Sequence, residues 1–396
     1  MTRIPSPLRT LAWSIYLGMS WTWCVGMFVT VVLYREFGFA AWVAVTIPNV
    51  IGAASVGFTF ARPGARSDAV VARHRQAVVG FSAITLAFHA FFLFWLARAG
   101  LIPTVAAAAA VASGLAIGLV NRRDIRVDLL LGVAVLAVSA VVLIHGLAHV
   151  GRAVLAPPDP PRTPTAMAAL AVVCAFGFLT CPYLDVTFHR ACQSLPPNPK
   201  RAAFGLGLGV VFLSMIAGTT LYAGDFNRGY AGAFTLAGLT TWVAAHLCVQ
   251  TGYKWAVHLR ALPPWRPSDA FVWAFALATA ALFAAGLVAH VNLGFHAYDD
   301  LILPGQVYYR LFTSFYGLLF PAYVWICMLP LPGRPAPGPT RQSLTVLAIA
   351  IALAAPMFWL GFLADQWAWI PVAVAVLLAA RLFVRSAETS ATDERR

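Results

Sequence analysis

The stretch Phe176-Gly-Phe-Leu-Thr-Cys-Pro-Tyr-Leu-Asp185-Val-Thr-Phe-His189 places an acid and a proline inside an apolar segment long enough to cross a membrane. Pro182 cannot donate a backbone hydrogen bond and clashes with the preceding turn, so we expect the helix to kink or unwind there. Irregular backbone at membrane depth requires protein or a water-filled cavity to satisfy it, and an intramembrane acid is costly without a partner. The stretch therefore predicts a polar site within the bilayer. The alternative is a structural kink in which Asp185 pairs with His189 or Arg190 near the cytoplasmic interface.

The composition of the whole chain indicates a polytopic membrane protein. Of its 396 residues, 61% are hydrophobic and 10% are charged. Each crossing needs about 20 apolar residues, and hydropathy predicts an all-α helical bundle of about twelve transmembrane helices. The predicted spans are 10–34, 38–60, 76–98, 103–120, 127–149, 166–189, 202–222, 229–253, 270–291, 305–331, 342–363 and 366–385. No loop between them is long enough to form an independent domain, so the function must reside in the bundle.

Basic residues are distributed unevenly over this span pattern. The net charge is +13, and placing the N-terminus in the cytoplasm puts 21 of the 27 Lys and Arg residues on the inner side. The positive-inside rule requires such a bias. We therefore expect a multi-pass protein of a bacterial inner membrane with both termini cytoplasmic. The basic excess is attributed to topology and contact with the anionic lipid bilayer, not to a nucleic acid partner.

A proline-rich loop at 156–164 divides the first five spans from the rest. Because five is odd, a second copy of these spans would enter the membrane upside down, which is the inverted-repeat plan of many secondary transporters. The predicted organisation is a first five-helix repeat at 1–150, a second, inverted repeat at 165–331, and two extra helices at 342–385. Gly18 and Gly26 lie in span 1 where the repeat predicts a break that matches the one in span 6.

This arrangement resembles the leucine-transporter fold of the amino acid–polyamine–organocation superfamily, which has five plus five plus two spans and breaks in spans 1 and 6. The local sequence is similar too: Cys24-Val-Gly26-Met-Phe is followed by Phe37-Gly38-Phe and Ile47-Pro48-Asn49. Thr180-Cys-Pro182-Tyr resembles the Met-Pro-His break of the macrophage-resistance-type metal transporters. The Asp-Pro-Gly-Asn motif of that family is absent, and Trp23-Cys24-Val25-Gly26 stands in its place. The resemblance implies two breaks that face each other near the midplane of the membrane.

The residues at these two breaks are the candidates for a substrate site. They are Trp21, Thr22, Cys24 and Gly26 in span 1, and Thr180, Cys181, Tyr183 and Asp185 in span 6. Carbonyl groups freed at a break coordinate cations, N–H groups at half-helix starts hold carboxylates, and aromatic rings wall the pocket. The alternative is that Trp21 packs as an ordinary interior residue and Gly26 permits close helix contact.

No cofactor is expected, but two sets of residues are candidates for a coupling-ion site, with Na+ or H+ as the ion. In sodium-coupled members of the resembled fold, adjacent Ser or Thr residues in span 8 join carbonyls of span 1, and Thr240 and Thr241 occupy such a place. A hydroxyl in a membrane helix also bonds readily to its own preceding turn. The other candidate is proton coupling through Asp185 and His189, at positions i and i+4 of one helix face.

Histidines near the outer ends of the spans suggest a different class of function. His145 and His149 have the spacing to bind one metal from one helix face, while His290, His296, Asp299 and Asp300 lie at the outer end of span 9 and beyond. Together they are compatible with a metal-dependent membrane enzyme. The alternative is that these are interfacial histidines bonded to water and carbonyls, and that His89 and His246 are buried or lining residues.

The sequence contains no phosphate-binding loop, dinucleotide fingerprint or nucleophile elbow in a loop able to use it. We therefore predict a secondary active transporter and not an enzyme. The substrate would be a small-molecule solute, such as an amino acid, an amine or a similar organic compound, moved by alternating access. A soft transition-metal ion held by Cys24 and Cys181 is the alternative substrate.

Overall fold

The computed structural model describes residues 6–22, 30, 33, 37–98, 100, 102–120, 124–149, 163–218, 237–293, 310, 314–330 and 336–384. Every regular element in these residues is helical, which confirms the predicted all-α bundle. The first half contains α1 (Ser6–Trp21), α3 (Phe39–Thr59), α4 (Ser67–Arg73), α5 (Arg75–Arg98), α6 (Thr104–Leu119) and α7 (Ile125–His149). The rest contains α8 (Pro164–Thr180), η2 (Cys181–Leu184), α9 (Val186–Ser194), α10 (Pro197–Leu206), η3 (Gly207–Phe212), α12 (Ala237–Ala261), α13 (Asp269–Leu293), η4 (Phe315–Leu319), α15 (Phe320–Tyr323), η5 (Val324–Met328), α16 (Arg341–Phe362), α17 (Trp369–Ala380) and η6 (Arg381–Phe383).

Length and composition qualify six of these helical segments as membrane spans. They are Phe39–Thr59, Arg75–Arg98, Pro164–Leu184, Pro197–Gly218, Asp269–Val288 and Arg341–Phe362. Three shorter apolar segments, Thr104–Leu119, Phe315–Met328 and Trp369–Phe383, fall within further predicted spans. These segments support an integral, multi-pass membrane protein.

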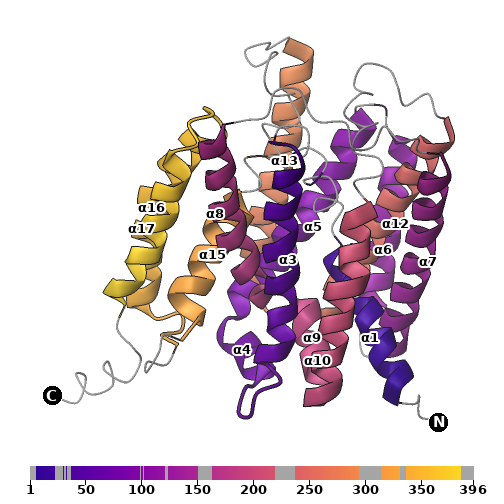
Figure 1. Cartoon of the computed structure of the whole chain (residues 1–396), viewed down its shortest axis with the longest axis horizontal. Coiled ribbons are helices and arrows are strands. Elements are labelled where there is room, and N and C mark those ends of the chain that lie inside the picture. The colour runs from indigo at the N-terminus through magenta and orange to yellow at the C-terminus, as the bar shows by residue number, and fades with distance from the viewer. Residues whose placement is uncertain are drawn as a thin grey trace.

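The long helices run side by side through the bundle, and the start of α1 lies at the same end as the end of α17 (Figure 1). On one flank α16 and α17 pack together beside α8, and on the other α6 and α12 pack against each other. Close approach of the latter pair depends on glycine, because a Cβ at Gly114 would collide with the backbone oxygen of Gly252. Buried apolar side chains form a large cluster around α1, α5 and α9 and a second one around α8, α16 and α17.

Two helices end inside the bundle, and they position the site. With 16 residues, α1 is about 24 Å long, which is shorter than the roughly 30 Å thickness of a hydrocarbon core. The helix α8 enters from the opposite end (Figure 1) and stops at Thr180, where η2 begins. The interruption expected from Pro182 is thus present, and α1 ends within the stretch where its counterpart was expected.

Candidate functional site at the interrupted helices

Asp185 forms the junction between the two parts of the interrupted helix. Its backbone is extended (φ −74°, ψ 114°), so it belongs to neither η2 nor α9. The Oδ1 atom accepts hydrogen bonds from the backbone N–H of Thr187 at 2.7 Å and from the Thr187 hydroxyl at 2.6 Å. Asp185 is therefore the N-cap of α9, which satisfies a backbone donor that the break leaves open.

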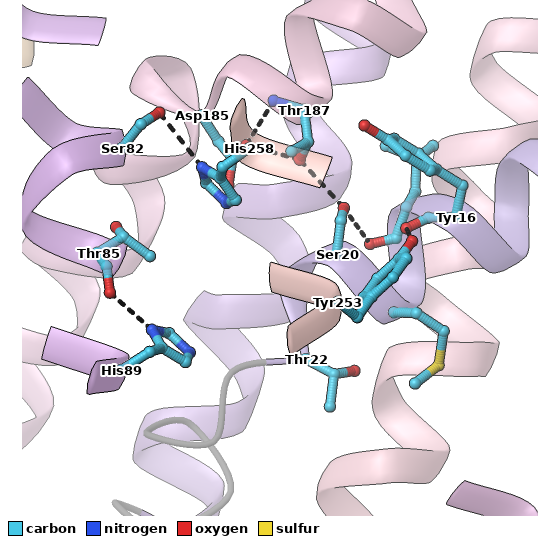
Figure 2. A network of polar contacts seen from close by, with 12 residues as sticks. Tyr16, Ser20, Thr22, Ser82, Thr85, His89, Asp185, Thr187, Tyr253 and His258 are labelled. Carbon is cyan, nitrogen blue, oxygen red and sulfur yellow. Dashed lines mark hydrogen bonds and ion pairs between the residues drawn. The ribbon is translucent and has the colours of Figure 1, made fainter. Parts of the chain in front are cut away.

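The second carboxylate oxygen of Asp185 is not used by this cap. Asp185 is fully buried, and Oδ2 has no hydrogen-bond partner among the described residues. It faces Nε2 of His258 on α12 at 3.9 Å, which is too long for a hydrogen bond. The Nε2 atom of His258 is also without a hydrogen-bond partner in the described part of the chain. Figure 2 shows Asp185 and Thr187 between His258 on one side and Ser20 on the other.

The end of α1 joins this cluster through the Ser20 hydroxyl and two backbone carbonyl groups. The Thr187 hydroxyl oxygen, whose proton is donated to Asp185, lies 3.1 Å from Ser20 Oγ. The side-chain amide of Gln250 on α12 donates to the carbonyl oxygens of Met19 at 2.9 Å and Thr22 at 2.6 Å. A helix that ends in the interior leaves its last carbonyls without intrahelical donors, and here Gln250 satisfies two carbonyls near the end of α1.

A buried polar row on α12 holds the cluster together. His246, Gln250, Lys254 and His258 recur every fourth residue, which places them along one helix face, and none is more than 6% exposed. The Lys254 ammonium interacts electrostatically with Asp185, His258 and His89. The sequence predicts His246 only as a buried or lining residue, and it misses Lys254 and His258 because the predicted span ends at 253. The helix in fact continues to Ala261, and the four-residue spacing was the signal that identifies the row.

The helix α5 closes the cluster on the side opposite α1. Its Ser82 hydroxyl lies 3.2 Å from Nδ1 of His258, and Nδ1 of His89 lies 2.7 Å from the carbonyl oxygen of Thr85. Both histidines are fully buried. His258 thus has one ring nitrogen held by α5 and the other directed at Asp185 (Figure 2).

The other predicted substrate residues have separate partners. The Trp21 indole donates to Asn49 Oδ1 at 2.6 Å, and the Thr22 and Thr180 hydroxyls donate to carbonyls of their own preceding turns. Cys181 donates through Sγ to the carbonyl of Tyr316 at 3.3 Å. The Tyr183 hydroxyl lies 2.9 Å from that of Thr59, so it contacts α3 rather than the cluster. Cys24 and Gly26 lie outside the described residues.

Of the other predicted coupling residues, His189 directs its ring to partners other than the Asp185 carboxylate, and Thr240 and Thr241 lie elsewhere along α12. His189 Nδ1 lies 2.8 Å from the Ser67 hydroxyl, and its Nε2 lies 2.9 Å from the Tyr183 carbonyl. The expected pairing of the Asp185 and His189 side chains is therefore replaced, because the Asp185 carboxylate caps α9 through Thr187 and both ring nitrogens of His189 have other partners. Arg190, the other expected local partner, binds Asp128. Thr240 and Thr241 lie among the first residues of α12, about 15 Å along the helix from Gln250, and their side chains are outside the described set.

The histidines considered for a metal enzyme are only partly described. His145 and His149 lie at the end of α7, and His290 lies in the last turn of α13, but their side chains are outside the described set. His296, Asp299 and Asp300 are outside the described residues. Among the residues that the structure covers, no three His, Cys, Asp or Glu side chains are grouped so that they could hold a metal ion.

The helices and their buried cluster define the chain as an all-α, polytopic membrane protein with interrupted helices around a polar interior. No protein-family model and no curated protein matches it. Its fold is similar to that of the manganese transporter of Eremococcus coleocola, crystallised in complex with an aromatic bis-isothiourea substituted compound. The TM-score is 0.52 and the sequence identity 14%, and the match covers 96% of this chain and 94% of the transporter. At this identity the likeness concerns the fold alone.

Proposed function

We propose that this protein is a secondary active transporter that moves a small solute by alternating access and is driven by a coupling cation. The observation that carries the proposal is that α1 and α8 both end inside the bundle, and that buried polar side chains of α12 lie beside the end of α1 and beside Asp185, which follows the break after α8. Broken helices that meet at a polar site are the usual substrate sites of secondary transporters. The likeness in fold to a solved transporter supports the same reading.

The proposed architecture has two inverted five-helix repeats, at 1–150 and 165–331, followed by two helices at 342–385, as in the leucine-transporter fold. Twelve spans would place both chain termini on the same side of the membrane, and the uneven distribution of basic residues favours the cytoplasm of a bacterial inner membrane. In this arrangement the broken helices, with α3 and α10, rock against a scaffold that includes α5 and α12. The cluster at Asp185 then lies where the moving part meets the scaffold.

The chemistry of the cluster favours a small organic solute. Ser20, Thr187 and Gln250 provide hydroxyl and amide groups, which recognise amines, amides and carboxylates by hydrogen bonding. Asp185 and Lys254 add one acidic and one basic group, a combination that complements a zwitterion such as an amino acid. A protonated Lys254, which interacts electrostatically with Asp185, would repel a divalent cation at this point.

A transition-metal substrate is the second candidate, because the solved structure of similar fold is a manganese transporter. The soft ligand on the described side of such a site would be Cys181, at the start of η2. Cys24 would supply the second thiol.

A ligand-stability screen on the purified protein separates these substrates. We expect an amino acid or amine to raise the melting temperature, because a ligand at about 100 times its Kd stabilises the folded state by about 2.7 kcal/mol. The solute identified should exchange across proteoliposomes that contain the wild-type protein. Asp185→Asn should lose this exchange, and Asp68→Asn, at an exposed acid of α4, should keep it.

The outcomes of the screen distinguish an organic solute from a metal ion as the substrate. Stabilisation and exchange by Mn²⁺ alone would replace the organic solute by the metal. If neither organic solutes nor metal ions exchanged across the proteoliposomes, the transport proposal itself would be wrong.

A further inference from the structure

Two buried atoms without hydrogen bonds face each other across the boundary between two helices. Asp185 Oδ2 lies at the start of α9, and His258 Nε2 lies on α12, 3.9 Å away. Both side chains are fully buried, and neither atom has a hydrogen-bond partner in the part of the chain that the structure covers. A buried polar atom left in this way costs about 1–3 kcal/mol, so two that face each other need a physical reason.

The cap of α9 does not supply this reason. Capping requires one oxygen, and Oδ1 performs it with two hydrogen bonds from Thr187. An asparagine caps a helix about as well as an aspartate and would bring no buried charge. The carboxylate therefore offers something that capping does not use, namely a second oxygen that can bind a proton.

The tautomer of His258 decides what the two atoms do to each other. If Nδ1 carries the proton, it donates to Ser82 Oγ, 3.2 Å away, and Nε2 turns a lone pair toward the carboxylate. Two acceptors then face each other, in keeping with the 3.9 Å separation. If Nε2 carried the proton, the pair would form a direct hydrogen bond of about 2.9 Å.

We propose that Asp185 and His258 form the proton-binding site that couples transport to a proton gradient. One added proton is held between Oδ2 and Nε2 and draws α9 toward α12, and its release separates the two helices. The proton enters the pair from one side of the membrane and leaves to the other when the broken helices rock. This inference rests on the proposed transport function and names H+ as its coupling ion.

The groups around the pair keep its charge in balance. Lys254 on α12 interacts electrostatically with both members, and His89 on α5 interacts with His258 and Lys254. Tyr16 on α1 and Tyr316 on η4 also lie within electrostatic range of Asp185. With Lys254 charged and His258 neutral, an ionised Asp185 makes the cluster neutral. The added proton gives it one positive charge, so protonation changes the electrostatics of the whole site.

The described contacts also favour a proton over a sodium ion as the coupling ion. The carbonyls of Met19 and Thr22, which a sodium ion would need at the end of α1, accept hydrogen bonds from Gln250. A protonated Lys254 interacts electrostatically with Asp185. A second cation at this point would be repelled, whereas a proton binds to the carboxylate itself.

Infrared spectroscopy tests the pair without a substrate. Spectra of the purified full-length protein would be compared between about pH 5 and pH 8, where imidazoles titrate. We expect a protonated-carboxyl band that grows on acidification, is lost in Asp185→Asn and shifts in frequency or midpoint in His258→Gln. Asp68→Asn serves as the control and should leave the band unchanged. A band that survives Asp185→Asn, or is unaffected by His258→Gln, would overturn the proposal.

A transport measurement then separates this inference from the proposed function. With the solute from the stability screen, the wild-type protein should accumulate solute under a pH gradient, and His258→Gln should lose this accumulation. Accumulation that follows a sodium gradient in the wild-type protein would overturn proton coupling and leave the transporter standing. If the pair titrated but the protein exchanged no solute, the pair would bind a proton and the transport proposal would be wrong.

Discussion

Two buried acids of this protein, Asp128 and Asp185, have opposite surroundings. Both are fully buried. Asp128 Oδ1 accepts from Arg260 on α12, and its Oδ2 accepts from Arg190 on α9. Asp185 has one oxygen engaged and the other facing an imidazole beyond hydrogen-bonding distance. A completed network such as that of Asp128 fixes helices in place, whereas an incomplete one leaves a group free to change its protonation state.

Both arginines around Asp128 make further hydrogen bonds to backbone carbonyls. Arg260 also donates to the carbonyls of Val120 and Asp124, both at 2.6 Å, and Arg190 donates to the carbonyl of Arg260 at 2.6 Å. The network thus ties α7, α9 and α12 together at the end of the bundle where the chain starts (Figure 1). The contrast assigns a structural role to Asp128, which holds three helices together, and a proton-binding role to Asp185. Four measurements test this assignment.

The largest effect is expected from Asp128→Asn. This change leaves the buried guanidinium of Arg260 and the partly exposed guanidinium of Arg190 without their carboxylate. Breaking a buried ion pair typically costs 3–5 kcal/mol, so we expect a loss of about 3 kcal/mol. Equilibrium unfolding of the purified protein measures the loss. Asp68→Asn, at an exposed ion pair with Arg66, is the control. If the two variants were equally stable, Asp128 would not be the structural acid.

Gln250→Leu should have the next largest effect. It removes the donor to the carbonyls of Met19 and Thr22 and leaves them buried, at a cost of about 1–3 kcal/mol. The matched control is Gln342→Leu, because Gln342 donates to the Phe383 carbonyl at an exposed position. Thermal unfolding of the two variants gives the comparison. Equal melting temperatures would mean that the end of α1 does not depend on α12.

His74 is a titrating group outside the membrane spans, and its effect on the pH dependence of stability can be compared with that of the Asp185–His258 pair. Burial lowers its pKa to about 4, with a smaller contribution from Arg73, and its Nδ1 lies 3.0 Å from the Tyr323 hydroxyl. The pKa of His74 is lower in the folded state than the unfolded value near 6.5, so the unfolded state binds a proton first as the pH falls. The fold therefore has its full stability above pH 6.5 and loses stability as the pH falls toward 4.

We therefore expect the wild-type protein to lose stability between about pH 6.5 and pH 4, and His74→Gln to lose about 1–2 kcal/mol less over that interval. Unfolding measured across this range checks the expectation. A variant as sensitive to acid as the wild type would assign the acid sensitivity to another group, the Asp185–His258 pair included.

Hydropathy and one proline predicted much of the fold and one residue of the cluster. The helical class and the break at Pro182 follow from local rules, because a proline and an apolar run act on their own segment. The partner of Asp185 does not follow from them. His189 is near in sequence, but the cap turns Asp185 out of the helix, and His258 is brought in by packing of α12. Hydropathy ends a predicted span at a charged residue, whether or not that residue is buried. Lys254 was therefore placed in a loop, although it is buried on α12.

The smallest effect on stability is expected from Asp185→Asn, and it is the sharpest test of the contrast. Asparagine keeps the acceptor for Thr187, so the cap of α9 should persist and the stability should change by less than about 1 kcal/mol. Removal of the charge beside Lys254 raises the cost of that ammonium, while the loss of a buried carboxylate lowers the total, and the two terms oppose each other. Equilibrium unfolding measures the sum, and Thr187→Val, which removes the hydroxyl donor and keeps the carboxylate, is the matched control. A loss as large as that of Asp128→Asn would mean that both acids serve the structure, and the assignment of a proton site to Asp185 would lose its physical basis.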